Sequence, residues 1–131
     1  MSWMESFSLA FTAGAFGGLA NGLAVWFFGI SGINKSLGVD IAPKLTPALI
    51  YSKVAWGGIW GLMFLIGFSE TSLLCKAVAI SIAPTLVQLF YVFPKAEKGT
   101  AGLKLGKLTP VMVVFFNLVW AIATAVWIRF S

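Results

Sequence analysis

Four polar side chains lie within long apolar segments of the chain, where a polar group is costly and therefore points to a structural or functional role. They are Asn21, Lys53, Gln88 and Asn117, one in each segment. Counted at about 1.5 Å per residue from the nearer loop, Lys53, Gln88 and Asn117 lie roughly 9 to 14 Å deep, and Asn21 lies at a similar or slightly greater depth. We therefore expect these four residues to form one polar layer.

Two interpretations of this polar layer are open. In the first, the three amides hydrogen-bond between helices, each pair contributing about 0.6 to 2 kcal/mol, while the Lys53 ammonium extends to the lipid headgroups. In the second, the layer lines a polar vestibule in which Lys53 attracts an anionic solute or lipid headgroup. The rim of that vestibule would then be formed by Tyr51, Ser52 and Tyr91.

Catalytic chemistry finds little support in the sequence. The chain contains no histidine and a single cysteine, which excludes imidazole-ligated haem or zinc and histidine general bases. All four carboxylates fall outside the apolar segments, at Glu5, Asp40, Glu70 and Glu97, so no acid–base pair or proton relay is expected within a membrane. We predict a non-enzymatic protein with no catalytic residue, no metal site and no cofactor.

The composition is typical of a membrane protein. Apolar residues make up 60% of the chain, charged residues make up 10%, and the mean hydropathy is +0.96, whereas charged residues approach a quarter of a soluble domain. The nine Lys and Arg residues are scattered between apolar runs and form no basic stripe. A nucleic-acid partner is therefore not expected, despite the net charge of +5.

The apolar segments predict an all-α fold, an integral membrane four-helix transmembrane bundle with short loops, formed by a single domain over residues 1–131. The expected spans are residues 8–30, 46–67, 73–93 and 109–128, with a tight turn over residues 68–72. Thr46 followed by Pro47 is typical of a helix start, and Thr109 with Pro110 repeats it. Pro84 should kink the third span, because it removes a backbone hydrogen bond.

Small residues recur in the first span at a spacing that predicts close helix packing. One row, at every fourth position, consists of Ala10, Gly14, Gly18 and Gly22, and a second row beside it consists of Ala13, Gly17 and Asn21. The second span adds a shorter motif, Gly57 and Gly61. We expect these two small-residue faces to pack on each other, and the alternative is that one of them faces another subunit.

Basic residues are divided unequally between the two ends of the spans. Seven lie in or beside the loops after the first and third spans, at Lys35, Lys44, Lys53, Lys95, Lys98, Lys104 and Lys107, whereas only Lys76 and Arg129 lie at the other end. By the positive-inside rule we expect both Lys-rich loops in the cytoplasm and both termini outside, in a bacterial inner membrane. Attraction to anionic lipid headgroups should contribute about 1 kcal/mol per well-placed Lys.

Two functional hypotheses follow. The leading one is a non-enzymatic membrane protein that acts through tight helix packing, as a homo-oligomer or as an accessory or assembly subunit of a larger membrane complex. The alternative is a small transporter or channel for an anionic or polar solute, with a cytoplasm-facing polar vestibule. A cavity open to the Lys-rich side and containing Lys53 would favour the alternative, whereas hydrogen bonds that join all four polar residues would remove its main support.

Overall fold

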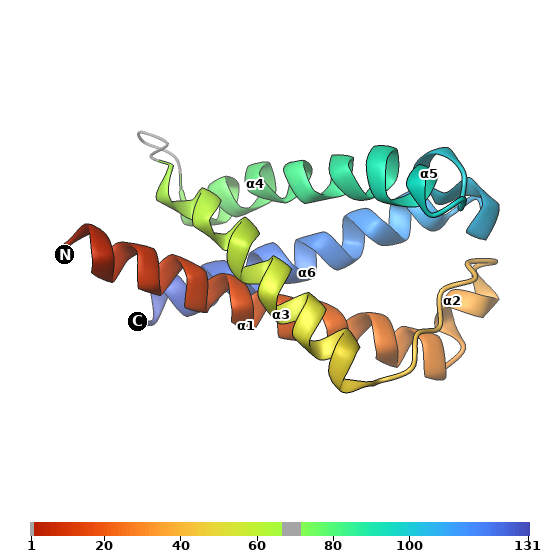
Figure 1. Cartoon of the computed structure of the whole chain (residues 1–131), viewed down its shortest axis with the longest axis horizontal. Coiled ribbons are helices and arrows are strands. Elements are labelled where there is room, and N and C mark those ends of the chain that lie inside the picture. Colours follow the sequence, from red (N-terminus) through yellow and green to blue (C-terminus); the bar gives the residue numbers. More distant parts are fainter. Residues whose placement is uncertain (1, 67–71) are drawn as a thin grey trace.

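The chain forms four long helical spans (Figure 1). The computed structural model describes residues 2–66 and 72–131, and no β-strand is found in them. The spans cover Trp3–Ile30, Pro47–Leu65, Leu73–Lys95 and Thr109–Arg129, and each is long and apolar enough to cross a membrane. The predicted all-α four-helix fold of an integral membrane protein is confirmed.

The first and last spans are single helices, whereas the second and third are composite. In chain order the elements are α1 (Trp3–Ile30), α2 (Ile33–Ser36), α3 (Pro47–Gly61), the 3-10 turn η1 (Leu62–Leu65), α4 (Leu73–Val87), the π-helical turn η2 (Gln88–Val92), α5 (Phe93–Lys95), the 3-10 segment η3 (Thr100–Leu105) and α6 (Thr109–Arg129).

Side-chain capping explains where the helices begin. The Ser2 hydroxyl oxygen accepts a hydrogen bond from the Glu5 backbone N–H at 3.2 Å, so α1 begins at Trp3 rather than at residue 8. The Thr46 hydroxyl oxygen accepts one from the Leu49 N–H at 3.2 Å, in agreement with its predicted role as an N-cap. α6 begins at Thr109 with Pro110 in its first turn, as predicted, but the buried Thr109 side chain forms no capping hydrogen bond.

The third span carries its main irregularity after Pro84. Helical hydrogen bonding continues past Pro84 to Val87, and the wider π turn η2 begins at Gln88. Turns of this kind occur within helices mostly as single irregular turns, often at functional sites. The predicted turn over residues 68–72 lies, apart from Ser72, outside the described residues, as does Gly67, the predicted end of the second span.

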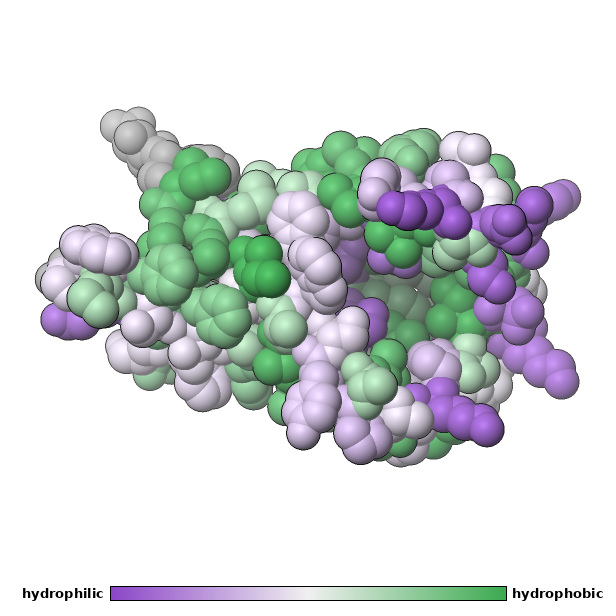
Figure 2. Space-filling view, in the orientation of Figure 1, coloured by the Kyte–Doolittle hydropathy of each residue, from purple (hydrophilic) through white to green (hydrophobic). Residues whose placement is uncertain are grey.

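The helices pack in the order α3, α1, α6, α4. α1 and α6 form the central pair, α3 lies on α1, and α4 lies on α6. Figure 1 shows α3 and α4 close together near the end that carries both termini and diverging toward the end that carries α2 and α5. In the half next to the Lys-rich loops, α3 and α4 therefore lie apart, and the space-filling view shows the surface hollowed there (Figure 2).

Apolar residues fill both ends of the bundle. Toward the termini, Phe64 of η1 and Ile80 of α4 pack with Trp120 of α6. At the Lys-rich end the two long loops meet, because the Asp40 backbone N–H donates a hydrogen bond to the Leu105 carbonyl oxygen at 2.7 Å. Packed side chains thus bound the bundle toward the termini, and a backbone contact joins the two loops at the other end.

Candidate functional site

Two adjoining cavities lie between α3 and α4, above the central helix pair. The deep cavity has a volume of about 380 Å³ and the outer cavity about 620 Å³. They share five lining residues, namely Asn21, Lys53, Gln88, Val92 and Asn117. All four members of the predicted polar layer therefore line both cavities, and we refer to the two cavities together as the vestibule.

The vestibule is open toward the Lys-rich end. The outer cavity reaches the loops, where it is lined by Asp40, Pro43, Ala96 and Lys98. Figure 2 shows the surface hollowed in this region, with both hydrophilic and hydrophobic residues around the hollow and hydrophilic residues at the adjoining end of the molecule. The outer cavity therefore connects the polar layer with the loops at that end.

At its inner end the vestibule is closed by aromatic side chains. Trp60 and Trp120 line the deep cavity, and the Trp120 ring packs edge-on against Phe64 with ring centroids 6.1 Å apart. The Trp120 indole N–H donates a hydrogen bond to the Gly14 carbonyl oxygen at 3.2 Å, which fixes the ring in place. Within the described part of the chain, these side chains therefore close the vestibule toward the termini.

Two amides of the polar layer join helices, but their partners lie outside the layer. The Asn21 amide nitrogen donates to the Phe116 carbonyl oxygen at 2.7 Å and links α1 to α6. The Asn117 amide nitrogen donates to the Thr85 hydroxyl at 2.9 Å and links α6 to α4. Among the described residues, the four members of the layer make no hydrogen bond to one another.

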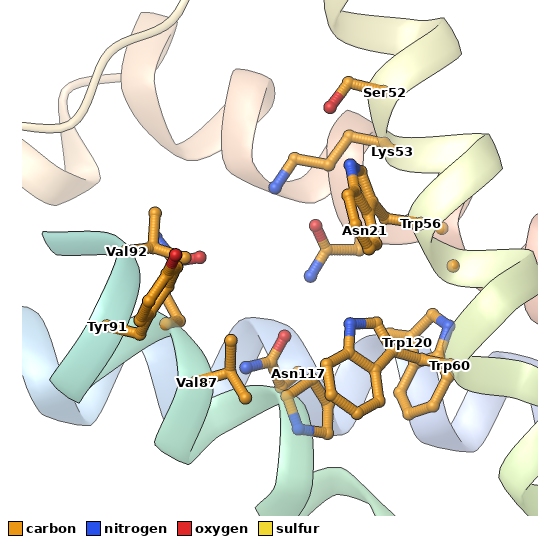
Figure 3. A pocket seen from close by; sticks show the side chains of 14 residues that line it. Asn21, Ser52, Lys53, Trp56, Trp60, Val87, Tyr91, Val92, Asn117 and Trp120 are labelled. Atoms are coloured by element: carbon orange, nitrogen blue, oxygen red, sulfur yellow. The ribbon is translucent and has the colours of Figure 1, made fainter. Parts of the chain in front are cut away.

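Lys53 extends into the vestibule from α3. Its side chain lies over Gly22, where a Cβ atom built on that glycine would be 3.0 Å from Lys53 Cγ. Figure 3 shows the amine directed into the space toward which the Asn21 and Asn117 side chains also point. Within the described part of the chain, neither the Lys53 ammonium nor the Gln88 amide forms a hydrogen bond or ion pair.

The two small-residue rows of α1 pack against two different helices. The Ala10 row faces α3, because a Cβ atom on Gly57 would lie 2.5 Å from the Gly14 carbonyl oxygen and one on Gly61 would lie 2.6 Å from that of Ala10. Gly18, in the same row, faces the Lys53 carbonyl. Gly17, in the second row, faces α6, since a Cβ atom there would lie 2.5 Å from the Trp120 carbonyl oxygen. Backbone contact between the Ala10 row and α3 sets the position from which Lys53 extends.

The predicted rim residues have different positions. Ser52 and Tyr91 line the deep cavity, and the Tyr91 hydroxyl oxygen accepts a hydrogen bond from the Lys95 ammonium at 3.0 Å. Tyr51 is 73% exposed and lines neither cavity, so its predicted place at the rim is wrong. The reason is helical spacing, because the residues of α3 that line the vestibule form one helical face made of Leu49, Ser52, Lys53, Trp56, Gly57 and Trp60, and Tyr51 lies off that face.

Thr85 is a site residue that the sequence analysis missed. Its hydroxyl accepts the hydrogen bond from Asn117 and donates one to the Ser81 carbonyl oxygen at 2.7 Å. The available signal was its position three residues before Gln88, which places the two side chains on the same helical face. Trp56 and Trp60 also line the deep cavity, and their aromatic character alone does not predict this position.

The free polar atoms of the vestibule define the chemistry that it can offer. Among the described residues, the donors without a hydrogen bond include the Lys53 ammonium, the Gln88 amide and the indole N–H groups of Trp56 and Trp60, and the free acceptors include the Oδ1 atoms of Asn21 and Asn117 and, in the outer cavity, the Asp40 carboxylate. No group of three or more metal-ligating side chains occurs in the described residues. The arrangement suits the binding of an anion.

Comparisons with known proteins give no independent indication of function. The chain matches no protein-family model, and no curated protein or solved structure was found to be similar to it. The case for a function therefore depends on the geometry of the vestibule.

Proposed function

We propose that this protein binds an anionic solute in the vestibule, which opens toward the Lys-rich loops, and acts as a small membrane carrier. The observation that carries this proposal is the position of Lys53, whose ammonium lies in an open cavity without a partner among the described residues. This is the second of the two functions expected from the sequence.

A purely structural role for Lys53 accounts less well for this position. A charge within a bilayer is costly and is normally paired, directed to the headgroups or used for function. Lys53 has no carboxylate partner in the described residues, and its stem lies over Gly22 and leads into the vestibule (Figure 3). An anion would supply the missing partner in a region of low dielectric, where the attraction is strong.

A carrier fits this geometry better than an open channel. The vestibule ends at Trp60 and Trp120, behind which Phe64 and Ile80 form a packed core. Passage to the other side would need a second conformation in which this core opens. Binding on one side followed by such a change is the mode of action of alternating-access carriers.

An accessory subunit or homo-oligomer is the second candidate. It is favoured by the open side of the bundle, where Trp56 is 59% exposed and Tyr91 is also 59% exposed. A second membrane helix could cover these side chains. The mass of the purified protein in mild detergent, together with the identity of any protein that co-purifies, tests this candidate.

The binding proposal is tested with the protein in nanodiscs of neutral phosphatidylcholine. Tryptophan fluorescence reports occupancy, because Trp56, Trp60 and Trp120 line the deep cavity. Inorganic phosphate and dodecyl phosphate are titrated separately against wild type, Lys53→Gln and the control Lys44→Gln, whose lysine lies in an exposed loop and lines neither cavity.

We expect at least one of the two anions to bind saturably to wild type and to the control, and about tenfold more weakly to Lys53→Gln. Equal binding by the two variants, or no saturable binding of either anion, would contradict the proposal.

A further inference from the structure

We infer, on the basis of the proposed function, that the ligand is an anionic amphiphile that enters sideways from the bilayer. Its headgroup would lie beside Lys53, and its hydrocarbon chain would leave through the gap between α3 and α4. This goes beyond the proposed function, which leaves open whether the anion comes from water or from the membrane.

The first support is the shape of the deep cavity. Its walls come from both α3, through Ser52, Trp56 and Trp60, and the third span, through Val87 and Tyr91. These two spans are packed on α1 and α6 and diverge from each other (Figure 1), and the space-filling view shows the surface hollowed between them (Figure 2). In a membrane this hollow faces lipid chains.

The second support is the division of the cavity into a polar and an apolar part. Figure 3 shows Lys53, Asn21 and Asn117 around the central space, with the Trp56, Trp60 and Trp120 rings beside it. Indole faces and Val87 offer contact area for methylene groups. A small hydrated ion would leave this apolar area without a favourable contact, whereas a hydrocarbon chain would cover it.

The third support is the set of free hydrogen-bonding atoms. Lys53 and Gln88 offer donors to a headgroup oxygen, while the Asn21 and Asn117 amide nitrogens are already engaged and leave their oxygens as acceptors. A headgroup that both accepts and donates hydrogen bonds would use all four residues. A phosphate monoester has this character, since its second pKa is about 6 and part of it keeps a hydroxyl near neutral pH.

The inference is tested by chain length and charge, with the nanodisc titration described above. The probes are inorganic phosphate, dodecyl phosphate and dodecyltrimethylammonium, which has the same chain and the opposite charge. We expect wild type to bind dodecyl phosphate about 100-fold more tightly than inorganic phosphate. The Lys53→Gln substitution should weaken the binding of dodecyl phosphate about tenfold. Dodecyltrimethylammonium should not bind saturably.

A pair of variants tests the route between the helices. Val87→Trp places a large ring in the opening, and its matched control, Val78→Trp, places one on the exposed face of α4, away from both cavities. We expect Val87→Trp to weaken dodecyl phosphate binding about tenfold and Val78→Trp to leave it unchanged.

The possible outcomes separate the two proposals. If inorganic phosphate binds as tightly as dodecyl phosphate and both need Lys53, the carrier proposal stands and the amphiphile inference is wrong. If dodecyl phosphate binds equally well to Lys53→Gln, or if the two tryptophan variants weaken binding alike, the amphiphile inference is overturned. If no probe shows Lys53-dependent binding, both proposals fail.

Discussion

The stem of Lys53 lies against the bare Cα of Gly22, so closely that a Cβ atom on the glycine would be 3.0 Å from Lys53 Cγ. This contact connects the small-residue face of α1 with the polar layer. Gly22 leaves room for the stem, while Gly18 one turn earlier faces the Lys53 carbonyl. The same row of α1 therefore positions both the backbone and the side chain of the proposed anion-binding residue.

Gly22→Leu should weaken anion binding without unfolding the protein. The leucine side chain would occupy the space of the flexible Lys53 stem, so the Lys53 ammonium would move away from the vestibule. The backbone contacts between α1 and α3 would persist. We expect binding of dodecyl phosphate to fall about tenfold. The matched control is Thr12→Leu on an exposed position of α1, and equal binding by both variants would contradict this role of Gly22.

Gly18→Leu should instead destabilise the fold. A side chain at this position meets the Lys53 carbonyl and the Cα of Gly57, which are backbone atoms and cannot move aside separately. Overpacking of this kind costs about 1 to 3 kcal/mol or more. The measurement is the thermal unfolding midpoint in detergent, with Thr12→Leu as the control, and an unchanged midpoint for Gly18→Leu would show that the contact does not hold α1 and α3 together.

The hydrogen bond between Asn117 and Thr85 should be detectable in a double-mutant cycle. Asn117→Leu and Thr85→Val each remove one partner of the 2.9 Å contact that joins α6 to α4. We expect a coupling free energy of about 0.6 to 2 kcal/mol in reversible unfolding from detergent micelles. Strictly additive effects of the two substitutions would indicate that this bond makes no net contribution.

The Lys-rich loops should face the cytoplasm. Lys44→Cys, in a Cys75→Ser background that removes the single native thiol, would be labelled by a membrane-impermeant maleimide in inverted membrane vesicles and protected in intact cells. A cysteine at Ser131 should show the reverse pattern, because the positive-inside rule places the termini outside. Labelling of Lys44→Cys in intact cells would reverse the predicted orientation.

The sequence predicted the fold well because each span is long, apolar and separated from the next by polar or glycine-rich residues. It also placed Asn21, Lys53, Gln88 and Asn117 at one depth, since depth within a helix follows from counting residues. The structure adds that all four line one space. The start of α1 was placed too late because Ser2 was not recognised as a cap.

What could not be predicted is which sides of the helices meet. One of the two interpretations of the polar layer has its amides bonding between helices, and Asn21 and Asn117 do so, but the sequence does not give their partners, Phe116 and Thr85, because partner choice depends on rotation about each helix axis. The opening between α3 and α4 was hidden for the same reason. An apolar sequence does not distinguish a face that packs on protein from one that faces lipid.

The most direct test of the account is the accessibility of position 53. We propose that Lys53 lies in a vestibule that admits water from the Lys-rich side and is closed toward the termini. Lys53→Cys in the Cys75→Ser background is treated with a membrane-impermeant methanethiosulfonate reagent from each side of sealed vesicles, with Lys44→Cys as the fully accessible reference. We expect modification of Lys53→Cys from the Lys-rich side alone, and its slowing by dodecyl phosphate. No modification from that side, or equal modification from both sides, would contradict the account.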